Sequence, residues 1–313
     1  ALAVIPKLPT LYDEPFSDPS QIPTFLVSQM ARRHVTVSLS GDGGDEVFGG
    51  YNRYFWGSNI WQKVGWMPKN LRQMGASALT SLSPQTWDQT LGNVSALVRV
   101  NLKKSMSGFQ AHKLAEVLAV SDPEAMYMGL VSHWKDPEAL VIGGFEPPTN
   151  LTDRQCWAKV PSFSETMMYL DTVTYLPDDI LVKVDRASMG VSLEGRIPFL
   201  DHRVVELAWR MPLSMKIRNN KGKLLLRQIL DKYVPRNLID RPKSGFGIPI
   251  DSWLRGPLRD WAETLLDEKR LQREGFFNPG PIREKWAEHL SGDRDWQYSL
   301  WAVLMFQAWL EVN

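Results

Sequence analysis

Three acidic side chains stand close together in a glycine-rich segment, residues 40–51, with the sequence Ser-Gly-Asp-Gly-Gly-Asp-Glu-Val-Phe-Gly-Gly-Tyr. Asp42, Asp45 and Glu46 lie within five residues, so their charges repel one another unless a cation is bound. Glycines let the backbone approach a ligand closely, and carboxylate oxygens suit Mg²⁺ carried by a nucleotide phosphate. A tight acidic turn that caps the next helix explains the pattern equally well. The spacing matches neither an EF-hand loop nor a Walker A loop.

A second charged segment, residues 178–201, joins a predicted helix to an extended stretch. Asp178, Lys183 and Arg186 are three to five residues apart, so a helix brings them near one another. We expect this helix to end around Gly190. On spacing alone, a salt-bridged surface helix followed by a structural turn is favoured over a binding site. The charged residues that flank the helix end are Glu194 and Arg196.

A third segment, residues 241–249, places Lys243 on a loop that contains glycine and proline. A lysine in such a loop can act as a mobile phosphate contact, although a solvated loop lysine is the commoner case. The histidines form no metal-binding spacing, and we interpret them as structural or exposed; they are His34, His112, His133, His202 and His289.

One short β-branched run, residues 34–40, is the best strand candidate, and it leads directly into the glycine-rich segment. Ligands bind at the carboxyl ends of strands in open α/β sheets. A lone strand needs partners, and we expect these upstream of Ala1, in a parallel sheet, rather than in weak strands elsewhere. Loops are expected at 143–152 and 242–249. Helices are expected at 21–33, 68–82, 110–120, 124–133, 165–175, 178–189, 201–210, 222–233, 250–271, 280–290 and 296–310.

Composition narrows the class of protein. The 313 residues carry a formal net charge of +1, which favours neither a nucleic-acid partner nor a membrane surface. The apolar runs are shorter than the roughly 20 residues that cross a bilayer. A single cysteine, Cys156, excludes an intrachain disulfide and is consistent with a reducing, cytoplasmic location. The 13 tryptophans follow no repeat, and helices such as 295–309 are expected in the core or against a partner, with a homodimer among the arrangements.

The three segments, in this order, resemble the synthetase domain of glutamine-hydrolysing asparagine synthetases. The resemblance rests on 40–51, 184–189 with 193–201, 243–247 and the upstream 13–24, and so covers nearly the whole chain. It implies an α/β fold: the predominantly helical C-terminal part of an adenine nucleotide alpha hydrolase-like (PP-loop) domain with a parallel sheet. Residues 1–313 would form one such domain, truncated at its N-terminus.

The resemblance implies a ligase reaction in which aspartate attacks the α-phosphate of ATP. An acyl-adenylate and pyrophosphate form, and ammonia from glutamine then displaces AMP. ATP and Mg²⁺ are the implied cofactors. Ser40 and Gly41 would contact the AMP portion, Asp45 would hold Mg²⁺, and Lys243 would contact a phosphate.

The catalytic residues implied by the resemblance are Asp42, Glu194, Lys243 and Arg186. Asp42 stands where relatives carry a glutamate or a tyrosine, and with Glu194 it is the candidate for handling protons. Arg186 would assist Lys243 at the phosphates. These motifs do not identify the carboxylate that is amidated. A uronic acid of surface polysaccharide or another small carboxylate is therefore an alternative to aspartate. A non-catalytic helical binding module is a second alternative.

Two parts of the family pattern are missing from these 313 residues. They are the Ser-Gly-Gly-x-Asp-Ser loop that grips pyrophosphate and the N-terminal glutaminase domain with its catalytic cysteine. We therefore expect the chain to be the later part of a longer protein. By itself it is expected to lack synthetase activity and to bind ATP weakly.

Overall fold

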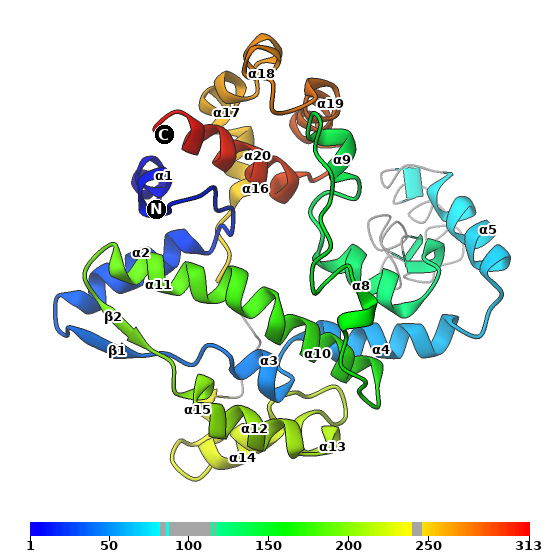
Figure 1. The fold of residues 1–313 in the computed structure, drawn as a ribbon, viewed down its shortest axis with the longest axis vertical. Coiled ribbons are helices and arrows are strands. Elements are labelled where there is room, and N and C mark those ends of the chain that lie inside the picture. The colour runs from blue at the N-terminus through cyan, green and yellow to red at the C-terminus, as the bar shows by residue number, and fades with distance from the viewer. Residues whose placement is uncertain (82–85, 88–113, 116, 240–245) are drawn as a thin grey trace, which may run out of the picture. The chain divides into compact units, whose positions relative to one another are not determined.

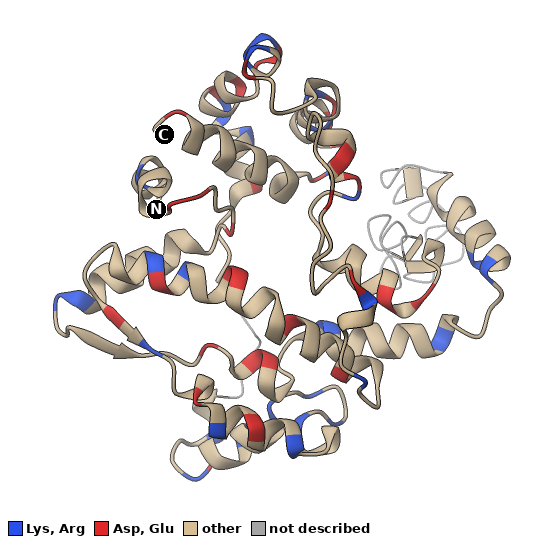
Figure 2. Ribbon diagram, in the orientation of Figure 1, with Lys and Arg blue, Asp and Glu red and all other residues tan. Residues whose placement is uncertain are grey.

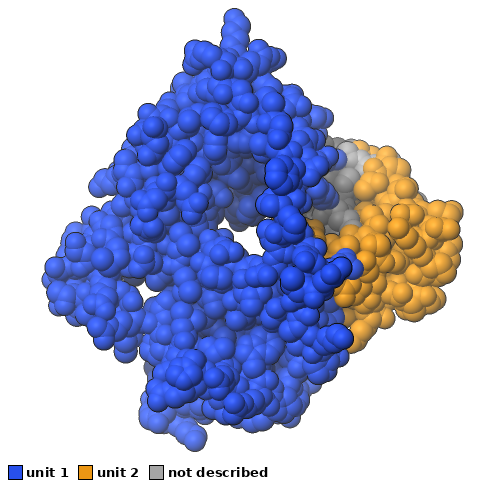
Figure 3. All heavy atoms as spheres, viewed as in Figure 1, with its two compact units in different colours: residues 1–54, 133–313 blue, residues 55–132 orange. Residues whose placement is uncertain are grey.

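The computed structural model describes residues 1–81, 86–87, 114–115, 117–239 and 246–313. The chain divides into two compact units, residues 1–54 with 133–313 and residues 55–132 (Figure 3). The single domain expected over 1–313 stays a prediction. Helices dominate the described residues (Figure 1), as the sequence indicated. No helix in the described part of the chain combines the length and apolar character that a bilayer span requires.

The larger unit has its main core around α20, Gln297–Leu310. This helix is apolar almost all round, so it packs inside the unit instead of on its surface. Trp301 on α20 and Trp286 on α19 are among its fully buried side chains, which places this tryptophan-rich segment in a core. The surrounding helices of the C-terminal part are α16 Ile250–Arg255, α17 Arg259–Leu265, α18 Glu268–Glu274 and α19 Pro279–Ser291.

The continuous helix expected at 250–271 is wrong, because the chain forms α16, α17 and the start of α18 there. Gly256 leaves the helical region with φ −124° and ψ −110°. Pro257 follows it, and a residue before proline is disfavoured in the α conformation. The second break comes at Asp267, whose side chain accepts a hydrogen bond from the Arg270 backbone N–H at 2.9 Å and so begins a new helix.

The predicted strand is present as β1, Val37–Leu39, and its partner lies within this chain. β2, Glu194–Arg196, pairs with β1 in parallel, with Val37 opposite Glu194 and Leu39 opposite Arg196. The expectation that the partner strands of β1 lie upstream of Ala1 is therefore wrong for one edge of β1, which pairs with β2. A Glu-Gly-Arg sequence has no strand signal of its own. Further upstream strands of a PP-loop sheet stay a prediction.

The larger unit contains many shorter elements around these. In its N-terminal part they are η1 Leu2–Lys7, α1 Leu8–Leu11, α2 Gln21–Arg32 and α3 Gly44–Phe48. After residue 133 they are α9 Pro137–Leu140, η3 Arg154–Cys156, α10 Phe163–Val173, the π-helix η4 Leu176–Leu181, α11 Val182–Met189, η5 Pro198–Leu200, α12 His202–Arg210, α13 Leu213–Lys216, α14 Leu224–Leu230 and α15 Arg236–Ile239.

The smaller unit is built from α5, Lys69–Thr80, and α8, Pro123–Val131, beside most of α4, Asn52–Val64. Arg72 on α5 donates to the backbone carbonyls of Val120 and Ser121 at 2.8 and 3.2 Å. The Asp122 carboxylate caps α8 by accepting from the Ala125 N–H at 2.7 Å. The predicted helices 68–82 and 124–133 are confirmed to within a few residues. Of the helix predicted at 110–120, residues 114–115 and 117–119 are helical and 110–113 and 116 lie outside the described residues.

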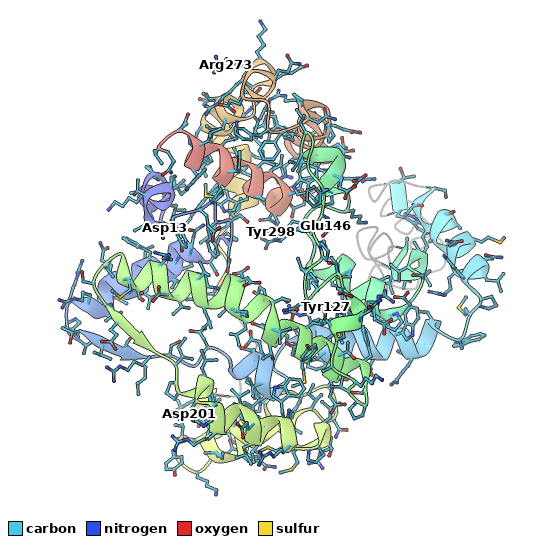
Figure 4. All side chains as sticks on the ribbon, viewed as in Figure 1. Asp13, Tyr127, Glu146, Asp201, Arg273 and Tyr298 are labelled. Atoms are coloured by element: carbon cyan, nitrogen blue, oxygen red, sulfur yellow. The ribbon has the colours of Figure 1, made fainter. Side chains whose placement is uncertain are left out.

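Helix α11 packs beside α2 (Figure 1), and two ion pairs fix it to the segment before α2. Lys183 Nζ lies 2.8 Å from Asp18 Oδ2, and Arg186 lies 2.6 Å from Asp13, which is labelled in Figure 4. The expected grouping of Lys183 and Arg186 with Asp178 is wrong, because both cations face the preceding segment and Asp178 is exposed. Helical spacing alone does not show which neighbouring segment supplies the partners.

Asp179 shares this buried region with Asp18, and one ammonium, that of Lys183, serves both carboxyls. Burial, together with the charge and hydrogen bond of Asp18, raises the pKa of Asp179 to about 8. Burial also disfavours ionisation of Asp18, but Lys183 and the Ser20 N–H outweigh it and hold the pKa of Asp18 below its ordinary value. The pair therefore holds one proton near neutral pH.

Stability is expected to fall as pH rises through this pair. Between about pH 4 and pH 8 the unfolded Asp179 is ionised and the folded one is protonated, so the free energy of unfolding decreases by at most about 1.4 kcal/mol per pH unit. An Asp179→Asn variant mimics the protonated acid and should remove this decline. Urea unfolding at a series of pH values measures it.

The matched control is Asp178→Asn, which makes the same substitution at an exposed neighbour and should keep the wild-type pH dependence. A decline that persists unchanged in Asp179→Asn would show that Asp179 does not hold the proton.

Candidate active site

The glycine-rich segment forms a turn, a five-residue helix and a second turn directly after β1. Gly43 begins α3 with φ +78° and Gly49 ends it with φ +69°, conformations that L side chains rarely adopt. A Cβ on Gly43 would lie 2.8 Å from Leu200, and one on Gly49 would lie 2.6 Å from Ile217. Glycine is needed at both positions for backbone conformation and for space, so α3 is held at both ends.

The first residues of this turn are tied to both strands and to each other. The Ser40 backbone N–H donates to the Arg196 carbonyl at 2.8 Å, which extends the β1–β2 ladder by one bond. The Ser40 hydroxyl donates to the Asp42 carboxylate, and the Gly41 carbonyl accepts from the Gly44 N–H at 3.3 Å. Ser40, Gly41 and Asp42 therefore lie at the carboxyl end of a parallel strand, where ligands bind in α/β sheets.

The neighbouring acids Asp45 and Glu46 lie on α3, where Figure 2 draws acidic residues in red, and their environments differ. Glu46 is 1% exposed and accepts a hydrogen bond from the Tyr51 hydroxyl at 2.6 Å. Burial raises the pKa of Glu46. The Asp45 side chain is 28% exposed, and its Oδ2 lies 2.9 Å from Lys223 Nζ. Asp45 is the carboxylate that can meet a ligand, whereas Glu46 belongs to the packing of the site.

Lys223 is a site residue that the sequence analysis missed. It precedes α14, with its backbone at φ +56°, a left-handed conformation that costs a residue with a side chain roughly 1–2 kcal/mol. Its N–H donates to the Phe48 carbonyl at 3.1 Å, so this turn is docked on the end of α3. The signal in the sequence was the run Asn-Asn-Lys-Gly-Lys at 219–223, a turn-forming stretch that reads as the start of a helix when taken alone.

Arg53 braces the far end of the glycine-rich segment. Its guanidinium lies 4.2 Å from the centre of the Tyr51 ring and donates to Asp171 at 2.7 and 2.9 Å. The Tyr54 hydroxyl donates to the same Asp171 oxygen at 2.5 Å. Asp171 is fully buried on α10, so this network fixes the chain that follows α3 to α10.

The remaining predicted residues are placed as follows. Glu194 opens β2 opposite Val37, toward the amino end of the sheet, and pairs with Arg196 at 2.7 Å. Asp42 follows the carboxyl end of β1, so the backbone does not bring it beside Glu194, and their joint role stays a prediction. Arg186 is paired with Asp13. Lys243 lies outside the described residues.

The Asp45 carboxylate fits a hard divalent cation. It presents oxygen atoms, it is partly exposed, and it already contacts a cation in the form of the Lys223 ammonium. Ser40 and Asp42 lie earlier in the same segment and are hydrogen-bonded to each other. Among the described residues of this segment, Asp45 is the one whose carboxylate would hold Mg²⁺.

A second group of metal-ligand types lies in the core region. His289 on α19 has Asp251 and Asp295 near it, with one ligand atom of each within 4.8 Å of the others. Arg255 pairs with Asp251, and the Trp296 N–H donates to His289 Nδ1 at 3.3 Å. Burial lowers the pKa of His289, as for a neutral packed imidazole. We interpret this group as structural, in line with the sequence expectation for the histidines.

The turn that contains Gly222 lies so close to the turn that contains Gly49 that a side chain does not fit at Gly222. A Cβ there would overlap the Gly49 carbonyl, which is backbone and has little freedom to move. Gly222→Ala should lower the free energy of unfolding by about 1–3 kcal/mol. Urea denaturation measures it.

Gly247→Ala is the control, since no atom of the described residues lies within 4 Å of the added carbon. It should leave stability unchanged or slightly higher, by up to about 1 kcal/mol. Equal stability of the two variants would contradict the docking of the turns.

A parallel strand pair is followed here by a glycine-rich turn with a partly exposed carboxylate, against which Lys223 of a separate turn lies. Ligands bind at this position, the carboxyl end of a strand, in α/β sheets. The chain belongs to the Asparagine synthase family, whose model matches residues 1–311.

Curated relatives agree with this assignment. The chain is 32% identical over 317 residues to a protein of Mycobacterium tuberculosis (strain H37Rv) provisionally named a glutamine-hydrolyzing asparagine synthetase. It is 28% identical over 322 residues to asparagine synthetase 1 (glutamine-hydrolyzing) of Bacillus subtilis. These alignments cover 98% and 99% of this chain but 44% and 45% of the relatives, so the chain spans under half of their length. A protein of Gibberella zeae named Amidase chry2 is 27% identical over 256 residues, 78% of this chain and 36% of the relative.

Proposed function

We propose that this chain belongs to an enzyme that amidates aspartate to asparagine at the expense of ATP. Aspartate forms an acyl-adenylate, pyrophosphate leaves, and ammonia derived from glutamine displaces AMP. Family membership supports the reaction class. The observation that carries the proposal is the partly exposed Asp45 carboxylate, which lies in the segment that directly follows β1. Lys223 Nζ lies 2.9 Å from it.

Pyrophosphate is a good leaving group only if cations near this turn stabilise its negative charge. Mg²⁺ bound at Asp45 would supply positive charge to the phosphates. Ser40 and Gly41 would contact the AMP portion through backbone groups at the strand end. Lys243 and Arg186 would add cationic contacts, Arg186 by leaving its exposed partner Asp13.

The second half-reaction releases a proton when ammonia attacks the acyl-adenylate. Asp42 would accept it; the position of its carboxylate on the turn, hydrogen-bonded by the Ser40 hydroxyl, supports this role. Glu194 would assist from β2.

The full gene product with Mg-ATP, ammonia and aspartate should release AMP and pyrophosphate and form asparagine. Asp45→Asn should reduce AMP release about a hundredfold or more, because one charged group at the phosphates is lost. Asp260→Asn, at an exposed position on α17, is the control and should match wild type. An active Asp45→Asn enzyme would contradict the metal role.

A panel of carboxylates tests the acceptor in the same assay. Release of AMP with a uronic acid but not with aspartate would keep the chemistry and replace the substrate. No carboxylate-dependent AMP release by the full gene product would favour a binding module. The 313-residue chain alone is expected to show no amide-forming turnover.

A further inference from the structure

The segment between α1 and α2, residues 12–20, lies against α11 as a strap that has no helix or strand of its own. Two ion pairs hold the strap on α11. Arg186 and Asp13 form an exposed pair, which contributes little to stability in water. Lys183 and Asp18 form a largely buried pair with an N–O distance of 2.8 Å. The attachment of the strap therefore depends mainly on the buried pair.

Two carboxyls at the buried part of the strap share one ammonium group, that of Lys183. Asp179 on the π-helix η4 is hydrogen-bonded to Asp18 and lies close to the same ammonium. Asp179 Oδ1 and Tyr12 Oη are both buried, and neither has a hydrogen-bond partner among the described residues. A buried carboxylate without donors is strongly disfavoured, so the cluster is stable only while the two acids share a proton.

The other titratable and charged groups around the pair do not supply the missing charge. Burial raises the pKa of Tyr12 on the strap and of Tyr175 before η4, and the charges of the two acids raise both pKa values further. Burial lowers the pKa of His133, so this imidazole is mostly neutral at pH 6.5 and above. Arg186 is engaged in its surface ion pair. The shared proton is therefore the group that balances the second carboxyl.

We propose that the strap is a pH-sensitive latch on α11, closed while Asp18 and Asp179 share a proton and lifted when that proton is lost. Two buried carboxylates then repel each other across a single ammonium, and one of them must reach water. Asp18 is the one that moves, because the strap lacks the helical hydrogen bonds that hold Asp179 in η4. The latch does not depend on the proposed reaction.

The latch joins the two helices that lead into the strand pair (Figure 1). α2 is followed by β1 and α11 is followed by β2. Asp18 lies just before α2, and its partner Lys183 lies on α11. Ile22 and Phe25 of α2 belong to the same buried cluster as Ala187 of α11. An open strap therefore removes a polar link between these helices and leaves their apolar contact in place.

Hydrogen exchange on the full gene product measures the latch at two amides beside Asp18. The Ser20 N–H donates to the Asp18 carboxylate at 2.8 Å, and the Gln21 N–H donates to the Asp18 carbonyl at 3.1 Å. Opening lets Asp179 ionise at its ordinary pKa of about 4, so it releases one proton. Protection of both amides, corrected for intrinsic exchange rates, should fall about tenfold from pH 6.5 to pH 7.5 and level off above about pH 8.

Two substitutions should each abolish this pH dependence. Asp179→Asn and Asp18→Asn both leave one carboxylate for one ammonium, so no proton is needed to close the strap. Asp178→Asn is the matched control, since it makes the same substitution at an exposed neighbour, and it should keep the wild-type dependence. Thermal unfolding of each variant identifies any loss of fold.

Repeating the exchange in dilute urea separates the latch from unfolding of the whole protein. A local opening exposes little surface, so urea should hardly change the protection of the two amides. Protection that is constant with pH, or that falls equally in a folded Asp179→Asn, would overturn the proposal. A strong urea dependence would also overturn it, because the two amides would then report global unfolding. A decline with pH that is insensitive to urea and absent from Asp179→Asn supports the latch.

Discussion

A helix of five residues is too short to be stable in water, so the position of Asp45 depends on everything packed around α3. Gly43 and Gly49 set its two ends. The turn that carries Lys223 holds its carboxyl end through the Phe48 carbonyl. The Arg53 network fixes the chain that follows. The candidate site is therefore built by tertiary contacts, and the helix contributes mainly the direction in which Asp45 and Glu46 point.

Adjacent acids in this protein have contrasting roles because the chain buries one and exposes the other. Asp45 faces the site, whereas Glu46 is buried against Tyr51. Asp178 is exposed, whereas Asp179 holds a proton beside Asp18. Buried carboxyls of this kind reduce stability unless protons or cations accompany them.

Much of the organisation followed from the sequence. The glycine-rich turn, the strand before it and most helices were predictable, because each depends on residues a few positions apart. Lys223 and β2 were missed. Both depend on contacts between segments far apart in the chain. A Glu-Gly-Arg sequence has no strand signal, and the turn-forming run at 219–223 does not show that its lysine contacts Asp45. The partners of Lys183 and Arg186 were misassigned for the same reason, and Gly256-Pro257 was underestimated as a helix break.

The strand pair also affects how this polypeptide behaves on its own. Leu39 on β1 is 76% exposed, with Val35 and Val37 also exposed, and neither β1 nor β2 has another strand partner among the described residues. Such a ribbon offers apolar side chains and unpaired amide edges to any strand that meets it. In concentrated solution this would favour self-association through the ribbon. Solubility during purification then depends on what covers these few residues, far more than on the overall charge.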